Sequence, residues 1–233
     1  MSRRAPTRSA TTRLLPLVLA LAWAAPAAAG SLEGDITLAS EYLFDGISQT
    51  DEDLATQASL TYTADNGFYI GSWASNVDFG EDDPASAEID FYMGVARTYD
   101  NGWGWDVGAA MYTYNGVGTQ YDYVEATAAV DFPFGSRLQV WASDDEVFGD
   151  KAWRATATHS FELPGEFSLD ARVTRTEYSN DIDFTPYWHY QLGVSKAFGN
   201  LSAYVGYSDT DLDDNPLADG RVLATISYSH TFF

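Results

Sequence analysis

The sequence contains no cysteine among its 233 residues, so a disulfide framework, a thiolate metal site and a thiol nucleophile are all excluded. Basic residues are scarce: twelve lysines and arginines stand against 34 acidic residues, and the formal net charge is −22. Such acidity argues against binding to nucleic acid, and against binding to anionic lipid through a basic patch. After residue 29 no continuous apolar run is long enough for a membrane-spanning helix. If this part of the chain spans a membrane, it must do so as a closed barrel.

The first 29 residues have the layout of a secretory signal peptide. Residues 1–13 carry four arginines, residues 14–25 form an apolar run, and residues 26–29 end in small side chains. We predict cleavage after Ala29. A transmembrane anchor is the weaker alternative, because the apolar run is shorter than the ~20 residues that a spanning helix needs. The predicted organisation is a signal peptide over residues 1–29 and an outer-membrane β-barrel over residues 30–233.

Alternation of apolar residues with acidic, small or tyrosine residues dominates the stretch 88–114. Two alternating runs flank Asn101-Gly102. An Asn-Gly pair in this position is a strong hairpin signal, because both residues tolerate the positive φ of a type I′ turn. The stretch therefore predicts two long strands, each apolar on one face only.

The same unit repeats along the chain and predicts twelve strands. They are expected at residues 35–44, 54–63, 68–79, 87–99, 103–114, 121–132, 137–143, 151–162, 167–178, 186–198, 201–208 and 220–232. Short turns rich in Gly, Pro, Asn and Asp alternate with longer connections at residues 45–53, 80–86, 115–120, 144–150, 179–185 and 209–219. This layout is typical of outer-membrane barrels, whose periplasmic turns are short and whose extracellular loops are long.

We therefore predict an all-β fold, a transmembrane antiparallel up-and-down β-barrel of about 12 strands with both termini on the periplasmic side. A secreted sandwich or lipocalin-like barrel would show similar alternation. Three features weigh against that soluble alternative. The strands exceed the usual ~5 to 6 residues, the polar face carries few lysines, and aromatic residues gather near the strand ends, as in membrane barrels.

Three segments carry a resemblance to a known family. Residues 40–50 read SEYLFDGISQT, residues 67–79 read GFYIGSWASNVDF, and residues 88–94 read EIDFYMG. With the length and turn order of the chain, these segments resemble a proteobacterial outer-membrane family, the TorF-type porins. The resemblance implies an outer-membrane barrel and specifies its architecture better than its activity.

The carboxyl-terminal strand is a second indication of this location. Val222, Ala224, Ile226 and Tyr228 alternate and the chain stops at Phe233, a pattern typical of strands that the barrel-assembly machinery recognises. The expected partners are therefore that machinery, outer-membrane lipid and lipopolysaccharide, and small polar solutes in the lumen, with no nucleic acid.

Charged and aromatic residues on the inward phase of the strands are the candidate pore lining. They are Asp90, Asp106, Tyr112, Glu125, Arg154, Arg172 and His189. Counting along the strands places acids on one wall and arginines on another. A transverse field across a constriction would sort solutes by charge. Salt-bridged residues that merely fill a narrow barrel are an equally open alternative.

The longer connections hold 18 of the 34 acidic residues and no lysine or arginine. The acidic outer rim is represented by Asp82, Asp145, Asp209, Asp211, Asp213 and Asp214. Such a rim is either a solvated surface or an attractor of cations, including divalent ions that bridge to lipopolysaccharide.

Twelve strands lie between the packed eight-stranded barrels and the aqueous sixteen-stranded porins, so a narrow pore is expected. The predicted function is a narrow, cation-preferring channel for small polar solutes, with no enzyme activity, no cofactor and no metal centre. Two alternatives stay open: a structural or adhesin-like barrel with a closed lumen, and a barrel-embedded hydrolase built on His189 with a nearby serine. No motif in the sequence selects that serine.

Overall fold

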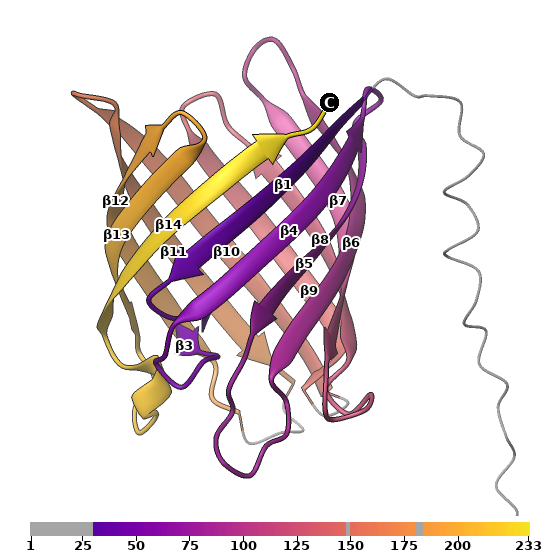
Figure 1. The fold of residues 1–233 in the computed structure, drawn as a ribbon, viewed down its shortest axis with the longest axis vertical. Coiled ribbons are helices and arrows are strands. Elements are labelled where there is room, and N and C mark those ends of the chain that lie inside the picture. Colours follow the sequence, from indigo (N-terminus) through magenta and orange to yellow (C-terminus); the bar gives the residue numbers. More distant parts are fainter. Residues whose placement is uncertain (1–29, 148–149, 180–183) are drawn as a thin grey trace, which may run out of the picture.

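The computed structural model describes residues 30–147, 150–179 and 184–233, and the predicted signal peptide at residues 1–29 lies outside them. Twelve antiparallel strands close into a barrel, with each strand beside its chain neighbour and β14 beside β1 (Figure 1). The strands of the wall are β1 (Gly30–Ala39), β4 (Ala55–Ala64), β5 (Phe68–Asn76), β6 (Ala87–Thr98), β7 (Gly104–Tyr114), β8 (Tyr123–Asp131), β9 (Ser136–Val147), β10 (Asp150–Leu163), β11 (Phe167–Tyr178), β12 (Tyr187–Phe198), β13 (Leu201–Thr210) and β14 (Arg221–Thr231). The predicted fold class is confirmed.

Three short elements lie outside the wall. Strands β2 (Leu43–Phe44) and β3 (Ile47–Ser48) pair with each other, and a 3-10 helix, η1 (Pro216–Ala218), lies between β13 and β14. Among the residues that the structure describes, no helix is long and apolar enough to cross a membrane.

Three predicted boundaries are wrong. The first strand begins at Gly30, five residues before its predicted start at residue 35. The strand expected at residues 35–44 leaves the wall after Ala39, because the next residues turn inward to build β2 and β3. The loop expected at residues 144–150 is largely strand, since β9 continues to Val147 and β10 begins at Asp150. The other ten strands lie within about two residues of their predicted bounds, apart from the end of β5 at Asn76.

The outer face of the barrel is apolar, as the alternation predicts. Large apolar side chains point away from the lumen and are exposed, among them Ile36 at 58%, Val107 at 56% and Val222 at 65%. An apolar belt around the whole wall would be a severe liability in water but is the stable surface in lipid. The alternation of one apolar and one polar face along each strand is thus the alternation of lipid and lumen.

The two ends of the barrel differ. The start of β1 and the carboxyl terminus lie at the end of the barrel where the turns are short (Figure 1). The long connections, including residues 40–54, 77–86 and 211–220, lie at the opposite end. An even number of wall strands requires this arrangement, because each strand reverses the direction of the chain.

Candidate functional site

The first long connection folds into the lumen instead of standing above it. Its tip is the β2–β3 pair, residues 43–48, here called the inner hairpin. The two turn residues, Asp45 and Gly46, both have positive φ, 45° and 90°, as a type I′ turn requires. Asp45 and Ser48 are buried, with 8% and 3% of their surface exposed. The inner hairpin therefore occupies space that an open barrel would leave to water.

Contacts on both flanks hold the inner hairpin against the wall. On β14, Arg221 pairs with Glu41 at 3.0 Å and with Glu52 at 3.1 Å, and these two acids flank the hairpin in sequence. The neighbouring β5–β6 connection also contacts it, because the N–H of Asp78 donates to the carbonyl of Gln49 at 2.8 Å. The connection is therefore fastened to the wall at both of its ends.

The tip of the inner hairpin is fixed by Arg154 of β10. Its Nη1 donates to Asp45 Oδ2 at 2.8 Å, while Nε donates to Glu125 Oε1 at 3.1 Å and Nη2 to Glu125 Oε2. The guanidinium also lies over the Phe44 ring, 4.4 Å from its centroid, and the Tyr112 hydroxyl donates to Glu125 at 2.7 Å. Arg154 and Glu125 are only 5% and 1% exposed. A buried ion pair of this kind resists separation, because removing either partner would leave an uncompensated charge in the interior and destabilise the fold.

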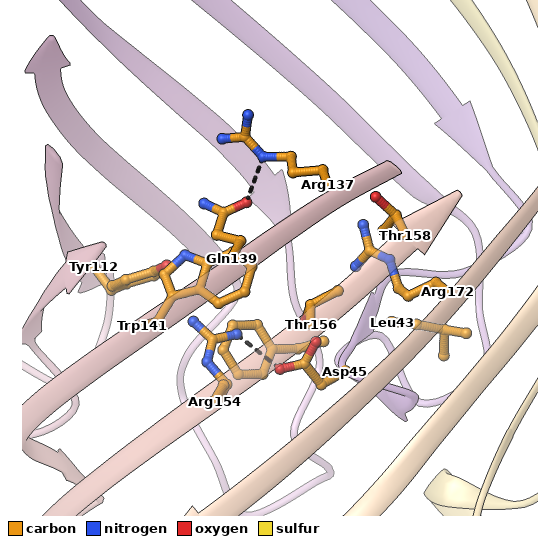
Figure 2. A pocket seen from close by; sticks show the side chains of 11 residues that line it. Leu43, Asp45, Tyr112, Arg137, Gln139, Trp141, Arg154, Thr156, Thr158 and Arg172 are labelled. Carbon is orange, nitrogen blue, oxygen red and sulfur yellow. Dashed lines mark hydrogen bonds and ion pairs between the residues drawn. The ribbon is translucent and has the colours of Figure 1, made fainter. Parts of the chain in front are cut away.

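A cavity of about 280 Å³ lies between the inner hairpin and the wall formed by β9, β10 and β11 (Figure 2). Asp45, Gln139, Trp141 and Arg172 are among its lining residues. A second cavity of about 340 Å³ shares Arg172 with the first and reaches Gly135 in the short turn between β8 and β9. The two cavities thus follow one side of the lumen toward the short-turn end.

A second ion-paired network lies on the β7–β9 side of the lumen. Arg137 contacts Asp106 at 3.0 Å and Asp131 at 2.9 Å. The hydroxyl of Tyr69 donates to Asp106 at 2.8 Å, and Arg137 Nε donates to Gln139 at 3.1 Å. These side chains are partly exposed, so the network lines the lumen without sealing it.

Lumen tyrosines lie against glycines of neighbouring strands. A Cβ atom added to Gly94 or Gly108 would lie 2.4 or 2.7 Å from the Tyr69 hydroxyl, and one added to Gly193 would lie 2.4 Å from Tyr204. Glycine at these positions lets the rings rest on the wall rather than project across the lumen. The glycines therefore preserve space inside the barrel.

A sequence profile described as "Bacterial protein of unknown function (Gcw_chp)" matches residues 23–232, which is nearly the whole chain. The chain belongs to the Gcw_chp family. No curated protein sequence matches it.

Solved porin structures resemble this Gcw_chp barrel in fold. The KdgM porin shares 7% identity at a TM-score of 0.56, over 86% of this chain and 99% of the porin. The NanC porin shares 9% identity at a TM-score of 0.55, over 88% of this chain and 100% of the porin. The COG4313 outer membrane channel from Pseudomonas putida F1 shares 12% identity at a TM-score of 0.52, over 90% of this chain and 97% of the channel. At such identities the likeness shows the fold alone.

The structure places the seven predicted pore-lining residues on the inward phase of their strands. It brings Tyr112, Glu125 and Arg154 into one network, while Asp106 belongs to the Arg137 network. Arg154 directly contacts acidic residues, although acids and arginines were predicted to face each other across the lumen. At Arg154 this contact favours the alternative that salt-bridged residues fill a narrow barrel. Arg172 stands apart from both networks.

His189 does have a serine neighbour. Its Nε2 lies 3.0 Å from Ser208 Oγ, the contact that a nucleophile and its base would make. Both side chains are buried, at 2% and 1% exposure, and Gly46 of the inner hairpin packs against the imidazole. A substrate has no room at this pair while the hairpin is in place.

The predicted rim residues do not form one set. Asp82, Asp211, Asp213 and Asp214 are exposed in long connections. Asp209 is instead the penultimate residue of β13, and Asp145 lies within β9, because both strands extend further than predicted. Among the described residues, no group of three or more His, Asp or Glu side chains is arranged to hold a metal ion.

Two of the long connections are joined at the rim. The Tyr121 hydroxyl donates to Asp83 Oδ2 at 2.6 Å, and this hydrogen bond raises the pKa of the Tyr121 phenol above its ordinary value. Tyr121 therefore links the β7–β8 and β5–β6 connections.

Sequence reasoning missed Asp45 in the Arg154 network, and Arg137 with its partners Asp131, Tyr69 and Gln139 in the second network. Asp45-Gly46 lies between Phe44 and Ile47, and an Asp-Gly pair between apolar residues is a hairpin signal of the same kind as Asn101-Gly102. Arg137 shares the inward phase of Gln139 but begins its strand, so it was left out of the lining.

Proposed function

We propose that this Gcw_chp protein is an outer-membrane channel, narrowed by its inner hairpin, for small polar solutes, with a preference for cations. The observation that carries the proposal is a polar lumen that retains cavities beside the hairpin inside a lipid-facing barrel. The KdgM porin, similar in fold, has been solved in complex with disordered oligogalacturonate. The resemblance to TorF-type porins agrees with the same function.

Unpaired carboxylates support the cation preference. Asp35 and Asp170 point inward, are half-buried and form no ion pair with any residue that the structure describes. Arg154 and Arg137, by contrast, are each neutralised by two acids. The lumen therefore presents an excess of negative charge, which favours cations over anions.

The test is the single-channel conductance of the purified protein in planar bilayers. Discrete conductance steps support a channel. A barrel that inserts and stays silent would instead be the structural alternative with a closed lumen.

The dependence of charge selectivity on ionic strength should separate the contribution of the acidic rim from that of the lumen residues. The Debye length is about 10 Å at 0.1 M salt and about 3 Å at 1 M, so attraction by exposed rim acids fades as salt rises. We expect a reversal potential that indicates cation preference at 0.1 M and a smaller preference at 1 M. Neutralising Asp82, Asp213 and Asp214 to asparagine should weaken the preference at low salt only. Asn is tolerated at the positive φ of Asp214. Anion preference at 0.1 M would refute the proposal.

Membrane orientation gives a separate prediction. The proposal places the long connections outside the cell, with lipid and lipopolysaccharide around the wall and insertion by the barrel-assembly machinery. Because the chain has no cysteine, single cysteines report position cleanly. Cysteine at Asp82 or Asp213 should react with an impermeant maleimide on intact cells, and cysteine at Asn101 or Asn200, in the short turns, should not. The opposite labelling pattern would reverse the orientation.

A further inference from the structure

Arg172 is an unpaired cation inside an acidic lumen. Four arginines point inward from the described strands, and Arg137, Arg154 and Arg221 each contact carboxylates within 3.1 Å. Arg172 forms no ion pair and no hydrogen bond with any residue that the structure describes. Its guanidinium lies beside Thr158 and points into the pocket (Figure 2). A positive charge is thus available to a solute where the two cavities meet.

An unpaired anion lies close by on the same strand. Asp170 precedes Arg172 by two residues on β11, so their Cα atoms are about 7 Å apart and both side chains face the lumen. Asp170 accepts hydrogen bonds from Ser160 and Ser195, each at 2.5 Å, and these bonds fix the carboxylate without neutralising it. Asp170 and Arg172 do not pair with each other. Two opposite charges are therefore held apart.

Both charges line the second cavity, together with polar groups. Gln191 and Tyr204 complete this wall, and Gln191 Nε2 donates to the Tyr204 hydroxyl at 2.8 Å. A volume of about 340 Å³ lies at the lower end of the range of about 300 to 1,000 Å³ for ligand pockets. The cavity thus suits a solute of a few non-hydrogen atoms.

Resting on the channel function proposed above, we propose that Asp170 and Arg172 form a binding site for small zwitterionic solutes. The planar guanidinium of Arg172 receives the carboxylate through paired N–H donors. The carboxylate of Asp170 receives the ammonium group. Such a solute has no net charge, so the acidic rim and lumen do not repel it.

Other solute classes fit this site less well. A small monocarboxylate could bind Arg172, but its single negative charge would also meet Asp170 and the remaining unpaired acids. A neutral amide or alcohol could enter the cavity without using either charge. These differences provide the arms of the experiment.

The experiment is liposome swelling with purified protein in isotonic alanine, lactamide or lactate. Alanine and lactamide are nearly equal in size, but only alanine is zwitterionic. We expect faster swelling in alanine than in lactamide, and slow swelling in lactate. In Arg172→Gln and in Asp170→Asn the alanine-to-lactamide ratio should fall about two- to fivefold, the range for one solvent-exposed ion pair. The lactamide rate should not change.

Arg97→Gln is the matched control, because Arg97 lies on the outward phase of β6 and is exposed. It should leave the ratio unchanged. Equal rates for alanine and lactamide in the native protein would overturn the zwitterion site while leaving the channel intact. No entry of any solute would overturn the channel itself. If Arg172→Gln slows lactate and alanine alike and Asp170→Asn has no effect, the site binds monocarboxylates and the proposal is wrong.

Discussion

Replacing Arg154 by methionine should lower the free energy of unfolding by about 3–5 kcal/mol, the usual cost of removing one partner from a buried ion pair. Arg154 neutralises Glu125 and Asp45 in a region where all three side chains are at least nine-tenths buried. Methionine keeps most of the length of the side chain but supplies no charge and no N–H donor. Glu125 would then be left with the Tyr112 hydroxyl alone, and Asp45 would lose its ion pair.

The measurement is urea unfolding of the protein folded into lipid vesicles, followed by fluorescence of the six tryptophans that come after residue 29. Arg97→Met is the control, because an exposed arginine should change the free energy by less than about 0.5 kcal/mol. Adding Glu125→Gln and Asp45→Asn to Arg154→Met should recover part of the loss, since no buried charge then lacks a partner. A loss for Arg154→Met as small as that of the control would show that these charges do not hold the hairpin.

The wall of the barrel could be predicted from sequence because its signal is local. One face of each strand meets lipid and the other meets water, so the apolar positions recur every second residue, as in Ile89, Phe91 and Met93. Turn residues such as Asn101-Gly102 then separate the strands. Neither signal depends on knowing which strands are neighbours.

The candidate site could be predicted only in part. Inward phase alone identifies Arg154, Glu125 and Arg172 as lining residues, but it does not show which of them pair. Asp45 contacts Arg154 across 109 positions of sequence, and that contact exists only because the inner hairpin folds back into the lumen. The unpaired state of Arg172 is equally invisible to inward phase, because it depends on Glu125 being paired with Arg154 and on Asp170 being held by Ser160 and Ser195.

Replacing Gly46 by valine should release the inner hairpin and raise the single-channel conductance severalfold. Gly46 has a φ of 90°, which a β-branched residue rarely adopts. A Cβ atom there would also lie 2.6 Å from Thr210 Cγ2 and 2.7 Å from His189 Cδ2, both of them on the wall. His189 is buried and hydrogen-bonded to Ser208, so it cannot easily move. The added side chain should therefore displace the two-residue turn, Asp45-Gly46, rather than the wall. Once the turn moves away from the wall, water and ions can enter the space that the hairpin occupied.

Gly80→Val separates this steric effect from the strain of a positive φ. Gly80 has a φ of 101° in the β5–β6 connection, and a Cβ atom added there would meet nothing within 4 Å. Both variants carry the same backbone strain, of order 1–3 kcal/mol, but only Gly46→Val collides with the wall. We therefore expect native conductance from Gly80→Val and larger conductance from Gly46→Val, measured in planar bilayers under identical salt. If both variants conduct like the native channel, the inner hairpin does not limit the pore, and the limiting section must lie nearer the short-turn end, at the Arg137–Asp106 network.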